Sequence, residues 1–304
     1  MHLIVGATGS LGGAVAKSLL ARGERVRAVA RAESPLRATG RFTDPAELRA
    51  LGADVVEADL RNPDTLEPLM RGVDTVLSTA SGTKRMEPDT LDAVDHRGTA
   101  ALARAAKRAG VSHLVYVSAR GTGPDANPFL RPKWEAENAI REHGPAATFI
   151  RPGQFMQDWI GFVLGAQIQG GSRVQVIGEG DPARAYVDEA DVAKLLTAVM
   201  LDGPPQAGTA TRQIDFTADT ATVSDVVGRI AALTGLPLTV ERIPVGRSID
   251  TVPEPLASIL TQLLTIASTI AHDALVTTDV SERYGIAPRT IDVFLQDLFA
   301  RTPA

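Results

Sequence analysis

The chain has 304 residues, a length that suits two domains or one large α/β domain. Its formal net charge of -5 gives no overall basic field for nucleic acid or an anionic membrane. The absence of cysteine excludes disulfides, thiolate metal sites and a cysteine nucleophile. Aromatic residues make up only 4%, which disfavours a base-stacking platform.

The first half of the chain alternates short β-branched runs with helical patterns. Predicted strands cover His2–Val5, Arg25–Ala30, Asp54–Ala58, Thr75–Thr79, His113–Ser118 and Ala147–Ile150. Predicted helices cover Ser10–Ala21, Pro45–Leu51, Asp64–Met70, Asp89–Ala109 and Pro132–Glu142. Strand, helix and strand repeated in this way predict right-handed βαβ units and a doubly wound parallel sheet, that is, an α/β Rossmann fold.

In the second half, strand and helix patterns alternate less regularly, and Pro/Gly clusters separate them. Predicted strands are Arg173–Val176, Gln213–Phe216 and Leu238–Arg242, and predicted helices are Asp188–Met200, Ser224–Thr234, Leu256–His272 and Thr290–Phe299. We expect a Rossmann domain over 1–152. Residues 153–304 then form mainly a smaller substrate-side cap, with returning segments at about 173–200 packing on the Rossmann core.

Neither a signal peptide nor a spanning helix is expected. The apolar run Leu3-Ile4-Val5 starts almost at the initiator Met, which leaves no room for a charged n-region. The uncharged stretch Leu256–His272 carries several Ser and Thr residues and has apolar residues at helical spacing, which predicts an amphipathic helix. It is either a core helix, a cavity wall or a subunit contact. We therefore expect a cytoplasmic protein, monomeric or homodimeric, without membrane or nucleic-acid partners.

A glycine-rich loop follows the first strand directly. Gly6, Gly9 and Gly12 have the spacing GxxGxxG, with Thr8, Ser10 and Leu11 between them. The first glycine permits a tight turn, the second a close backbone approach to a pyrophosphate, and the third close helix–sheet packing. Because the loop opens an amphipathic helix within a βαβ unit, it predicts dinucleotide binding.

The end of the second strand bears on which dinucleotide is bound. An NAD site places Asp or Glu there, whereas this strand ends in Arg31, whose guanidinium suits a 2′-phosphate. Arg37 could assist, and a small shift of the turn could bring Glu33 to the ribose instead. The pattern favours NADP(H) over NAD(H).

Taken together, the motifs and their order resemble the NmrA-like group of atypical short-chain dehydrogenase/reductases, which includes isoflavone-reductase-like and quinone-reductase-like proteins. The resemblance covers nearly the whole chain. It rests on GATGSLGG at Gly6–Gly13, VRAVAR at Val26–Arg31, ADLRNPDTL at Ala58–Leu66, VDHRGTAALARAAKRAGVSHLVYVSA at Val94–Ala119, Lys133 with Glu137, IRPGQFMQ at Ile150–Gln157 and AYVDEADVA at Ala185–Ala193.

The resemblance implies further cofactor contacts. In its relatives an acidic-Leu pair touches the adenine, a segment after the fourth strand runs beside the riboses, and a loop after the sixth strand lies against the nicotinamide. The matching residues here are Asp59, Leu60, Thr79, Ala80, Ser81, Pro152, Gly153, Gln154 and Phe155.

The resemblance also implies catalytic roles for Ser118, which would polarise a substrate carbonyl, and Lys133, which would hold the nicotinamide ribose. The superfamily's Tyr acid, four residues before that lysine, is replaced here by Phe129. Asp95 stands where many relatives have the Asn of the proton relay. Either Lys133 or water then supplies the proton, or there is no chemistry.

Other tyrosines could compensate for the missing acid. Tyr116 is expected to point into or along the buried fifth strand, Tyr284 lies far along the chain, and Tyr186 precedes a predicted helix and could reach the site. Arg151 either pairs with a carboxylate or sits near the ligand. The aromatic and Met residues Trp134, Phe155, Met156, Trp159 and Phe162 either line an apolar pocket or pack between the sheet and the cap.

No metal site is expected, because the five histidines (His2, His96, His113, His143 and His272) have no ligand spacing. No G-x-S-x-G elbow occurs, so a serine hydrolase is disfavoured. The sequence favours an NADPH-dependent reductase of an apolar carbonyl, quinone or enone. Two alternatives remain: a non-catalytic NADP(H) sensor acting through a partner protein, and a cofactor-retaining isomerase or cyclase.

Overall fold

The computed structural model describes residues 1–31, 42–82, 89–206, 208, 210–269 and 280–300. Its contacts divide the chain into two compact units. Unit 1 comprises Met1–Arg151, Val192–Asp215 and Glu282–Ile286, and unit 2 comprises Pro152–Asp191, Phe216–Ser281 and Ala287–Ala304. Of the segment predicted to return to the Rossmann core, the part from Val192 onward belongs to unit 1.

A seven-stranded sheet organises unit 1, in the order β10-β6-β5-β4-β1-β2-β3. Its strands are β1 (His2–Val5), β2 (Val26–Ala30), β3 (Asp54–Glu57), β4 (Thr75–Ser78), β5 (His113–Val117), β6 (Ala147–Pro152) and β10 (Thr211–Phe216). Every pairing from β3 across to β6 is parallel, in register Ile4↔Ala28 and Ile4↔Leu77 at the centre. The predicted doubly wound fold is confirmed. The strand order reverses between β1 and β4, which is where open α/β sheets bind ligands.

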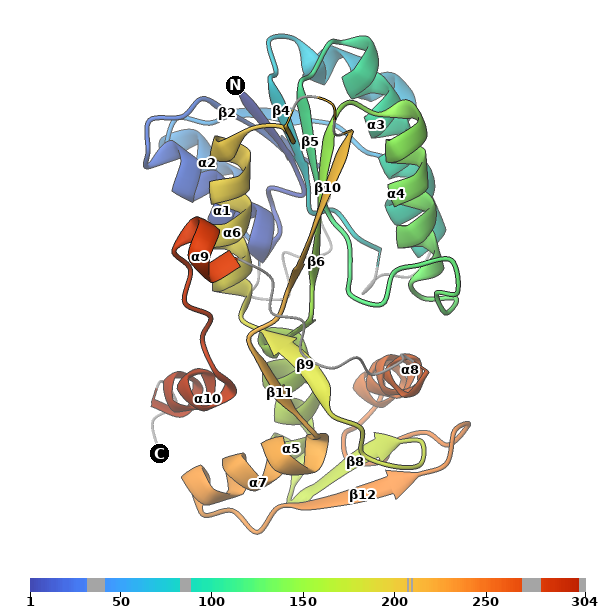
Figure 1. The fold of residues 1–304 in the computed structure, drawn as a ribbon. Helices are drawn as coiled ribbons and strands as arrows, with labels where there is room; N and C mark the ends of the chain where they lie inside the picture. Colours follow the sequence, from blue (N-terminus) through green and yellow to red (C-terminus); the bar gives the residue numbers. More distant parts are fainter. Residues whose placement is uncertain (32–41, 83–88, 207, 209, 270–279, 301–304) are drawn as a thin grey trace. The chain divides into compact units, whose positions relative to one another are not determined.

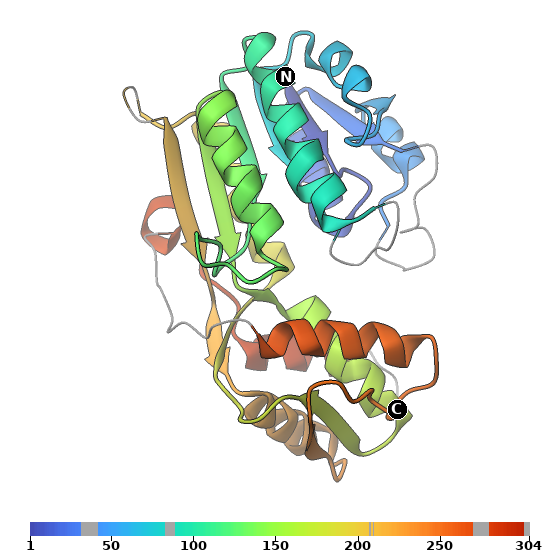
Figure 2. The ribbon, with the colours of Figure 1, turned by 90° about the vertical axis from the view of Figure 1, so that its right-hand side faces the viewer.

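Helices cover both faces of this sheet (Figures 1 and 2). The longer ones are α1 (Ser10–Leu20), α3 (Thr99–Arg108), α4 (Arg131–His143) and α6 (Glu189–Asp202), and the short ones are α2 (Pro45–Ala50) and α9 (Val280–Tyr284). Helices α3 and α4 lie side by side on one face, and α1 lies on the other. Both faces of the central strands are therefore buried, which explains why β4 and β5 read as continuous apolar runs without alternation.

Two predicted helices of unit 1 take a different form. The segment Asp64–Met70 forms two 3₁₀ turns, Pro63–Thr65 and Glu67–Met70, because the ring of Pro68 excludes a regular α-helix there. The segment predicted as one helix from Asp89 to Ala109 begins as a π-helix, η4 (Asp92–Gly98), before α3. Such π-turns are rare and recur at functional sites.

Unit 2 contains two small sheets. A three-stranded sheet has the order β11-β9-β7, and a parallel pair joins β12 to β8. The strands are β7 (Gln154–Phe155), β8 (Arg173–Ile177), β9 (Arg184–Val187), β11 (Asp219–Ala221) and β12 (Thr239–Ile243). Its helices are the π-helix η5 (Gln157–Leu164), α5 (Gly165–Gly170), α7 (Val223–Thr234), α8 (Leu256–Ser268) and α10 (Ile291–Ala300).

The uncharged segment forms an amphipathic helix, as predicted. In α8 the residues Ala257, Leu260, Leu264 and Ala267 are buried, which is the spacing of one helical face. His272, the predicted end of this helix, lies outside the described residues. No helix in the described part of the chain is long and apolar enough to span a membrane.

Candidate active site

The glycine loop after β1 is shaped by close backbone contacts. Gly6 has a φ of 90°, a conformation that L-residues rarely adopt. A Cβ at Gly6 would lie 2.5 Å from the Thr79 Oγ1, and one at Gly12 would lie 2.3 Å from the Gly6 carbonyl oxygen. The loop and the start of α1 are thus pressed together in a way that only glycine permits.

The backbone amides of the first turn of α1 lie at the end of the glycine loop. Gly9 is the N-cap in an extended conformation, and among the described residues no side chain caps the helix there. Ser10 and Leu11 begin the helix, and Thr8 is held by its carbonyl, which accepts a 2.9 Å hydrogen bond from the Thr43 amide. A helix N-terminus reached through Cβ-free backbone is the arrangement that a pyrophosphate requires, so the loop fits a dinucleotide.

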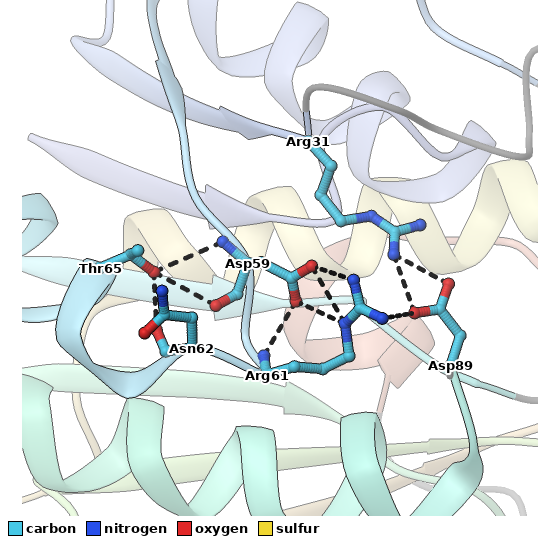
Figure 3. Close-up of polar contacts among 6 residues, drawn as sticks. All are labelled: Arg31, Asp59, Arg61, Asn62, Thr65 and Asp89. Carbon is cyan, nitrogen blue, oxygen red and sulfur yellow. Dashed lines mark hydrogen bonds and ion pairs between the residues drawn. The ribbon is translucent and has the colours of Figure 1, made fainter. Parts of the chain in front are cut away.

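A chain of ion pairs lies beyond the ends of β2 and β3 (Figure 3). Arg31 follows β2, and its guanidinium donates to both carboxylate oxygens of Asp89, at 3.0 and 2.8 Å. The same carboxylate lies 3.3 Å from a second guanidinium, that of Arg61. Arg61 in turn makes paired hydrogen bonds to Asp59, at 3.0 Å from Nε. Two guanidiniums and two carboxylates thus alternate along one row, which we call the arginine row.

The Asp59 end of the arginine row is fixed by its own backbone turn. Its Oδ1 accepts a 2.9 Å hydrogen bond from the Arg61 amide, and its carbonyl accepts one from Asn62. The Thr65 hydroxyl closes the same turn against the Asp59 backbone. The hydrogen-bonded Arg61 guanidinium lowers the pKa of the Asp59 carboxyl below its usual range. The next residue, Leu60, is buried and packs under Gly98.

The segment after β4 runs alongside the glycine loop. The Thr79 amide donates to the Val5 carbonyl at 3.0 Å, and its hydroxyl lies 3.4 Å from the Gly6 carbonyl. Ala80 and Ser81 follow as partly exposed residues. This is the edge between β1 and β4 at which the strand order reverses. The residues predicted to run beside the cofactor riboses are therefore brought next to the predicted phosphate loop.

Gly82 ends that segment with two tight contacts. Its amide donates to the Asp95 Oδ2 at 2.7 Å. A Cβ at Gly82 would lie 2.6 Å from the Asp89 carbonyl oxygen and 2.7 Å from the Thr90 backbone. The absence of a side chain therefore seats the backbone of Asp89 against the β4 segment.

Lys133 lies on the first turn of α4 and is almost completely buried. Its Nζ is 2.9 Å from the Asp95 Oδ1, and it donates to the Val117 carbonyl at 3.3 Å. Asp95 is wholly buried on the π-helix η4. Ser118 follows β5 beside that carbonyl, is 3% exposed, and its hydroxyl donates to the Thr122 Oγ1 at 3.4 Å. The structure thus brings the two predicted catalytic residues of unit 1 to the end of one strand.

The tyrosines of unit 1 do not replace the missing acid. Tyr116 lies inside β5 with no exposed surface, as predicted, and the Lys133 Nζ is 5.5 Å from its ring centre. Burial raises the pKa of Tyr116 well above its usual value, which makes it a poor proton donor. The Tyr284 hydroxyl is occupied at 3.2 Å by Asp202. Phe129 lies one turn before Lys133, in a turn fixed by the Asn127 side chain.

Arg151 has a structural partner. At the end of β6 its guanidinium donates to the buried carboxylate of Glu137, at 2.8 Å from Nε. Arg141 donates to the same carboxylate at 2.7 Å. Of the two interpretations left open by the sequence, pairing with a carboxylate is the one observed. The pair connects α4 to β6.

The remaining predicted site residues belong to unit 2. Pro152 ends β6, the Gly153 amide donates to the Phe216 carbonyl at 2.9 Å, and Phe155 lies in β7. Tyr186 is 2% exposed in β9, within the apolar core of that unit. Burial raises its pKa to about 12, which disfavours it as an acid near neutral pH. Its catalytic role stays a prediction.

The apolar residues proposed for a pocket wall make core contacts. Met156 is fully buried in the core of unit 2, and Trp159 packs against both apolar clusters there. In unit 1 the Trp134 ring is stacked by the Arg141 guanidinium at 5.2 Å. Each of these contacts lies within one unit, so the pocket wall and the packing between sheet and cap both stay predictions.

One group within metal-ligand distance occurs among the described residues: Asp92, His96 and Glu135. The His96 Nδ1 is 3.1 Å from Asp92 and 3.3 Å from Glu135, which are ordinary ion-pair contacts on a partly exposed surface. Sequence spacing could not show this group, because Glu135 comes from another helix.

Sequence reasoning missed Arg61 and Asp89. Arg61 stood in the quoted motif directly after Asp59 and Leu60, so its position was visible although its pairing was not. Asp89 is 58 residues from Arg31, and no local signal joins them. Arg37 and Glu33, the other residues considered for the ribose, lie outside the described residues.

Comparisons with known proteins agree with this geometry. The NmrA-like family model matches residues 2–295. The NAD(P)H azoreductase of Xenophilus azovorans is 31% identical, over 88% of this chain and 87% of its own. The (4-alkanoyl-5-oxo-2,5-dihydrofuran-3-yl)methyl phosphate reductase of Streptomyces griseus is 32% identical, over 75% and 74%.

Solved structures share the fold. The triphenylmethane reductase of Citrobacter sp., complexed with NADP(H), has a TM-score of 0.75 at 19% identity, covering 98% of this chain and 99% of its own. The quinone oxidoreductase of Escherichia coli complexed with NADPH has a TM-score of 0.72 at 22% identity, covering 98% and 100%. The homologues identify an oxidoreductase that uses a nicotinamide cofactor. With a family model matched from residue 2 to residue 295, the chain belongs to the NmrA-like family.

Proposed function

We propose that the chain is an NADPH-dependent reductase of an apolar quinone, enone or carbonyl compound. The observation that carries the proposal is the arrangement along one edge of the unit 1 sheet. The glycine cradle follows β1, guanidiniums lie beyond β2 and β3, and Ser118 and Lys133 lie at the end of β5 and the start of α4. A phosphate site, a cationic corner and a pair of hydrogen-bond donors are the parts that this chemistry needs.

The two guanidiniums of Arg31 and Arg61 support the binding of NADPH over NADH. Arg31 and Arg61 both reach one carboxylate, so their guanidiniums converge on a single anion position. A 2′-phosphate has the geometry that such guanidiniums recognise. The azoreductase relative is named for NAD(P)H, which covers both cofactors, so the choice depends on this chain's own residues.

The contacts of Lys133 support a role in orienting a ligand. An ammonium has three N–H donors. Lys133 donates to the Val117 carbonyl at 3.3 Å and pairs with Asp95 at 2.9 Å, and we infer that an N–H donor remains for a ribose hydroxyl or a substrate oxygen. The Ser118 hydroxyl, at the end of the same strand, can donate to an oxyanion that develops during reduction. NADPH supplies the hydride when it is bound.

The missing acid narrows the substrate class. Phe129 has no proton to give, and Tyr116 is fully buried. Reduction of a simple ketone produces a strongly basic alkoxide that needs an acid in the transition state, whereas a quinone or enone gives a delocalised, weakly basic anion that water can protonate afterwards. We therefore favour quinone and enone acceptors over simple ketones.

The test is NADPH oxidation with product analysis across quinones, enones, simple ketones and azo compounds. We expect stoichiometric reduction of at least one quinone or enone, and much slower reduction of ketones. Replacing Lys133 by Ala should lower kcat/KM by about 10²-fold, in the range of a lost positioning or acid–base group. The exposed Lys107→Ala change on α3 serves as the control. Tight cofactor binding without turnover on any acceptor would instead favour the sensor.

The cofactor preference has a separate test. The charge reversal Arg31→Asp should weaken NADPH binding by about tenfold or more while NADH binding changes little, since charge-assisted hydrogen bonds are worth about 1.5–3 kcal/mol. The matched control is Arg49→Asp, an exposed arginine in the last turn of α2. An unchanged ratio of the two dissociation constants in Arg31→Asp would reject Arg31 as the selector.

A further inference from the structure

A pocket of about 460 Å³ lies in unit 1 beside the start of α3. One wall is the turn that follows β3, and the other is formed by η4 and the first two turns of α3. All the residues that line it belong to the described part of the chain, and none comes from the glycine loop. Its volume lies in the range of small-molecule binding sites.

The floor of this pocket, formed by its buried lining residues, is apolar. Gly98, Ala100 and Ala101 are buried, and Leu60 beside them is 7% exposed. A Cβ at Gly98 would lie 2.9 Å from the Leu60 Cβ, so glycine lets the turn after β3 approach the helix closely. The short side chains leave the pocket open, and its floor offers apolar contact to a ligand.

The rim of the pocket is basic. Its lining includes Arg61, His96, Arg97 and Arg104 and no acidic residue. Arg97 and Arg104 are exposed and lie seven residues apart, two turns along one helical face, while Arg61 and His96 keep 31% and 32% of their side chains exposed. In a chain whose formal net charge is -5, this rim concentrates positive charge around an apolar floor.

Carboxylates outside the lining hold three of these basic side chains in place. The Asp92 carboxylate is 2.7 Å from the Arg97 Nε and 3.1 Å from the His96 Nδ1. Asp59 accepts paired hydrogen bonds from the Arg61 Nε at 3.0 Å (Figure 3). A guanidinium has five N–H donors, so an ion pair at Nε does not by itself use them all. The basic groups are therefore oriented before a ligand arrives.

From this pocket we propose a second ligand site, which binds an organic phosphate with an apolar body. The phosphate lies among the guanidiniums, whose paired N–H donors match its oxygens. The apolar body covers the floor at Leu60, Ala100 and Ala101, which removes apolar surface from water. The inference goes beyond the proposed reductase activity and does not depend on which nicotinamide cofactor the chain prefers.

The experiment uses three probes that separate the two halves of such a ligand. 2-Naphthyl phosphate has both halves, 2-naphthol lacks the phosphate, and inorganic phosphate lacks the apolar body. Their dissociation constants are measured on the full chain by calorimetry, with and without saturating NADPH. Arg104→Gln removes one guanidinium from the rim, and Lys107→Gln, an exposed lysine on the same helix outside the lining, is the matched control. Ala100→Leu fills part of the floor without changing any charge.

We expect 2-naphthyl phosphate to bind more tightly than either partial probe. Arg104→Gln should weaken it by about threefold or more, the scale of a charged contact near solvent, and should change 2-naphthol binding less than about twofold. Lys107→Gln should leave both unchanged, and Ala100→Leu should weaken 2-naphthyl phosphate more than inorganic phosphate.

Three results would overturn the inference. The first is a 2-naphthyl phosphate affinity no better than that of 2-naphthol, and the second is wild-type affinity in Arg104→Gln. The third is loss of binding in saturating NADPH, which would place the probe in the cofactor site. A crystal structure of the wild-type chain with 2-naphthyl phosphate adds a check that does not depend on how the variants fold. It should show the phosphate within hydrogen-bond distance of Arg97 or Arg104, and a phosphate bound elsewhere would contradict the inference.

Discussion

Two sets of ion pairs lie at the carboxyl edge of the same sheet, and they differ in how deeply they are buried. The Lys133–Asp95 pair is sealed: Asp95 has no exposed surface, and backbone groups of Gly82 and Val117 complete the contacts. The arginine row is partly exposed, because Arg31 and Arg61 keep 20% and 31% of their side chains exposed. Breaking a buried pair leaves an uncompensated charge and costs much stability, whereas a partly exposed pair contributes little.

The largest effect is expected from breaking the sealed pair. Lys133→Ala would leave the buried Asp95 carboxylate uncompensated and should lower the free energy of unfolding by about 3–5 kcal/mol. Urea denaturation measures this change. The double variant Lys133→Met/Asp95→Asn should recover a large part of the loss, because no unpaired charge remains. A single-variant loss below about 1 kcal/mol would mean that the pair is not sealed in solution.

The next prediction concerns a buried histidine, His113, and the change in stability as the pH falls. His113 lies at the other end of β5 and contacts the Thr148 hydroxyl at 2.9 Å, and burial, helped by Arg212, lowers its pKa to about 4. The native state then disfavours the proton that the unfolded chain accepts near its ordinary pKa of about 6.5. Stability should fall by roughly 2–4 kcal/mol as pH drops from about 6.5 to about 4.

Urea unfolding at a series of pH values tests this sign. In His113→Gln, which does not titrate, the slope between those two pH values should be correspondingly smaller. A steeper loss in the variant than in the wild type would contradict the assigned burial effect.

The backbone cradle offers a test that involves no charge. Gly12→Ala would place a Cβ 2.3 Å from the Gly6 carbonyl oxygen. We expect a stability loss of about 1–3 kcal/mol, the usual cost of overpacking, together with weaker cofactor binding. The control is Gly228→Ala in α7, where a Cβ meets nothing within 4 Å and helix propensity predicts a gain of about 0.5–1 kcal/mol. Equal effects at both glycines would refute the close-contact argument.

The smallest change in stability is expected in the partly exposed arginine row. Removing the guanidinium in Arg61→Gln should raise the pKa of Asp59 toward its ordinary value, measurable by NMR titration of the carboxyl. Since a lowered carboxyl pKa stabilises the fold only above that pKa, the stability loss should appear at neutral pH and vanish in acid. For a group this exposed we expect no more than about 1 kcal/mol. A loss as large as that of Lys133→Ala would erase the distinction between the two sites.

The sequence predicted the sheet well because periodicity and burial act locally. Val26 to Ala30 and His113 to Val117 are apolar enough to be read as strands with both faces covered, and the glycine loop between β1 and α1 has a local steric logic. The predicted neighbours Ser118 and Lys133 were found through the family pattern.

What escaped prediction depends on tertiary placement. The π-turn of η4 and the bridging of Arg31 and Arg61 by Asp89 arise only when segments distant in the chain meet. No periodicity encodes the fact that a carboxylate at residue 89 will face a guanidinium at residue 31. The small sheet of unit 2, with strands of two to four residues, was likewise too short to leave a pattern.

Gly82 has a consequence for how this fold can vary. Its amide fixes Asp95 of the sealed pair, and its missing side chain makes room for the backbone of Asp89 in the row. A side chain at Gly82 would therefore disturb both the hydrogen bond to Asp95 and the close packing against the Asp89 backbone. The position is therefore closed to substitution from two directions, and a change there could not be confined to either site. Variation at this edge of the sheet has to proceed through the side chains of the arginine row rather than through the backbone that supports it.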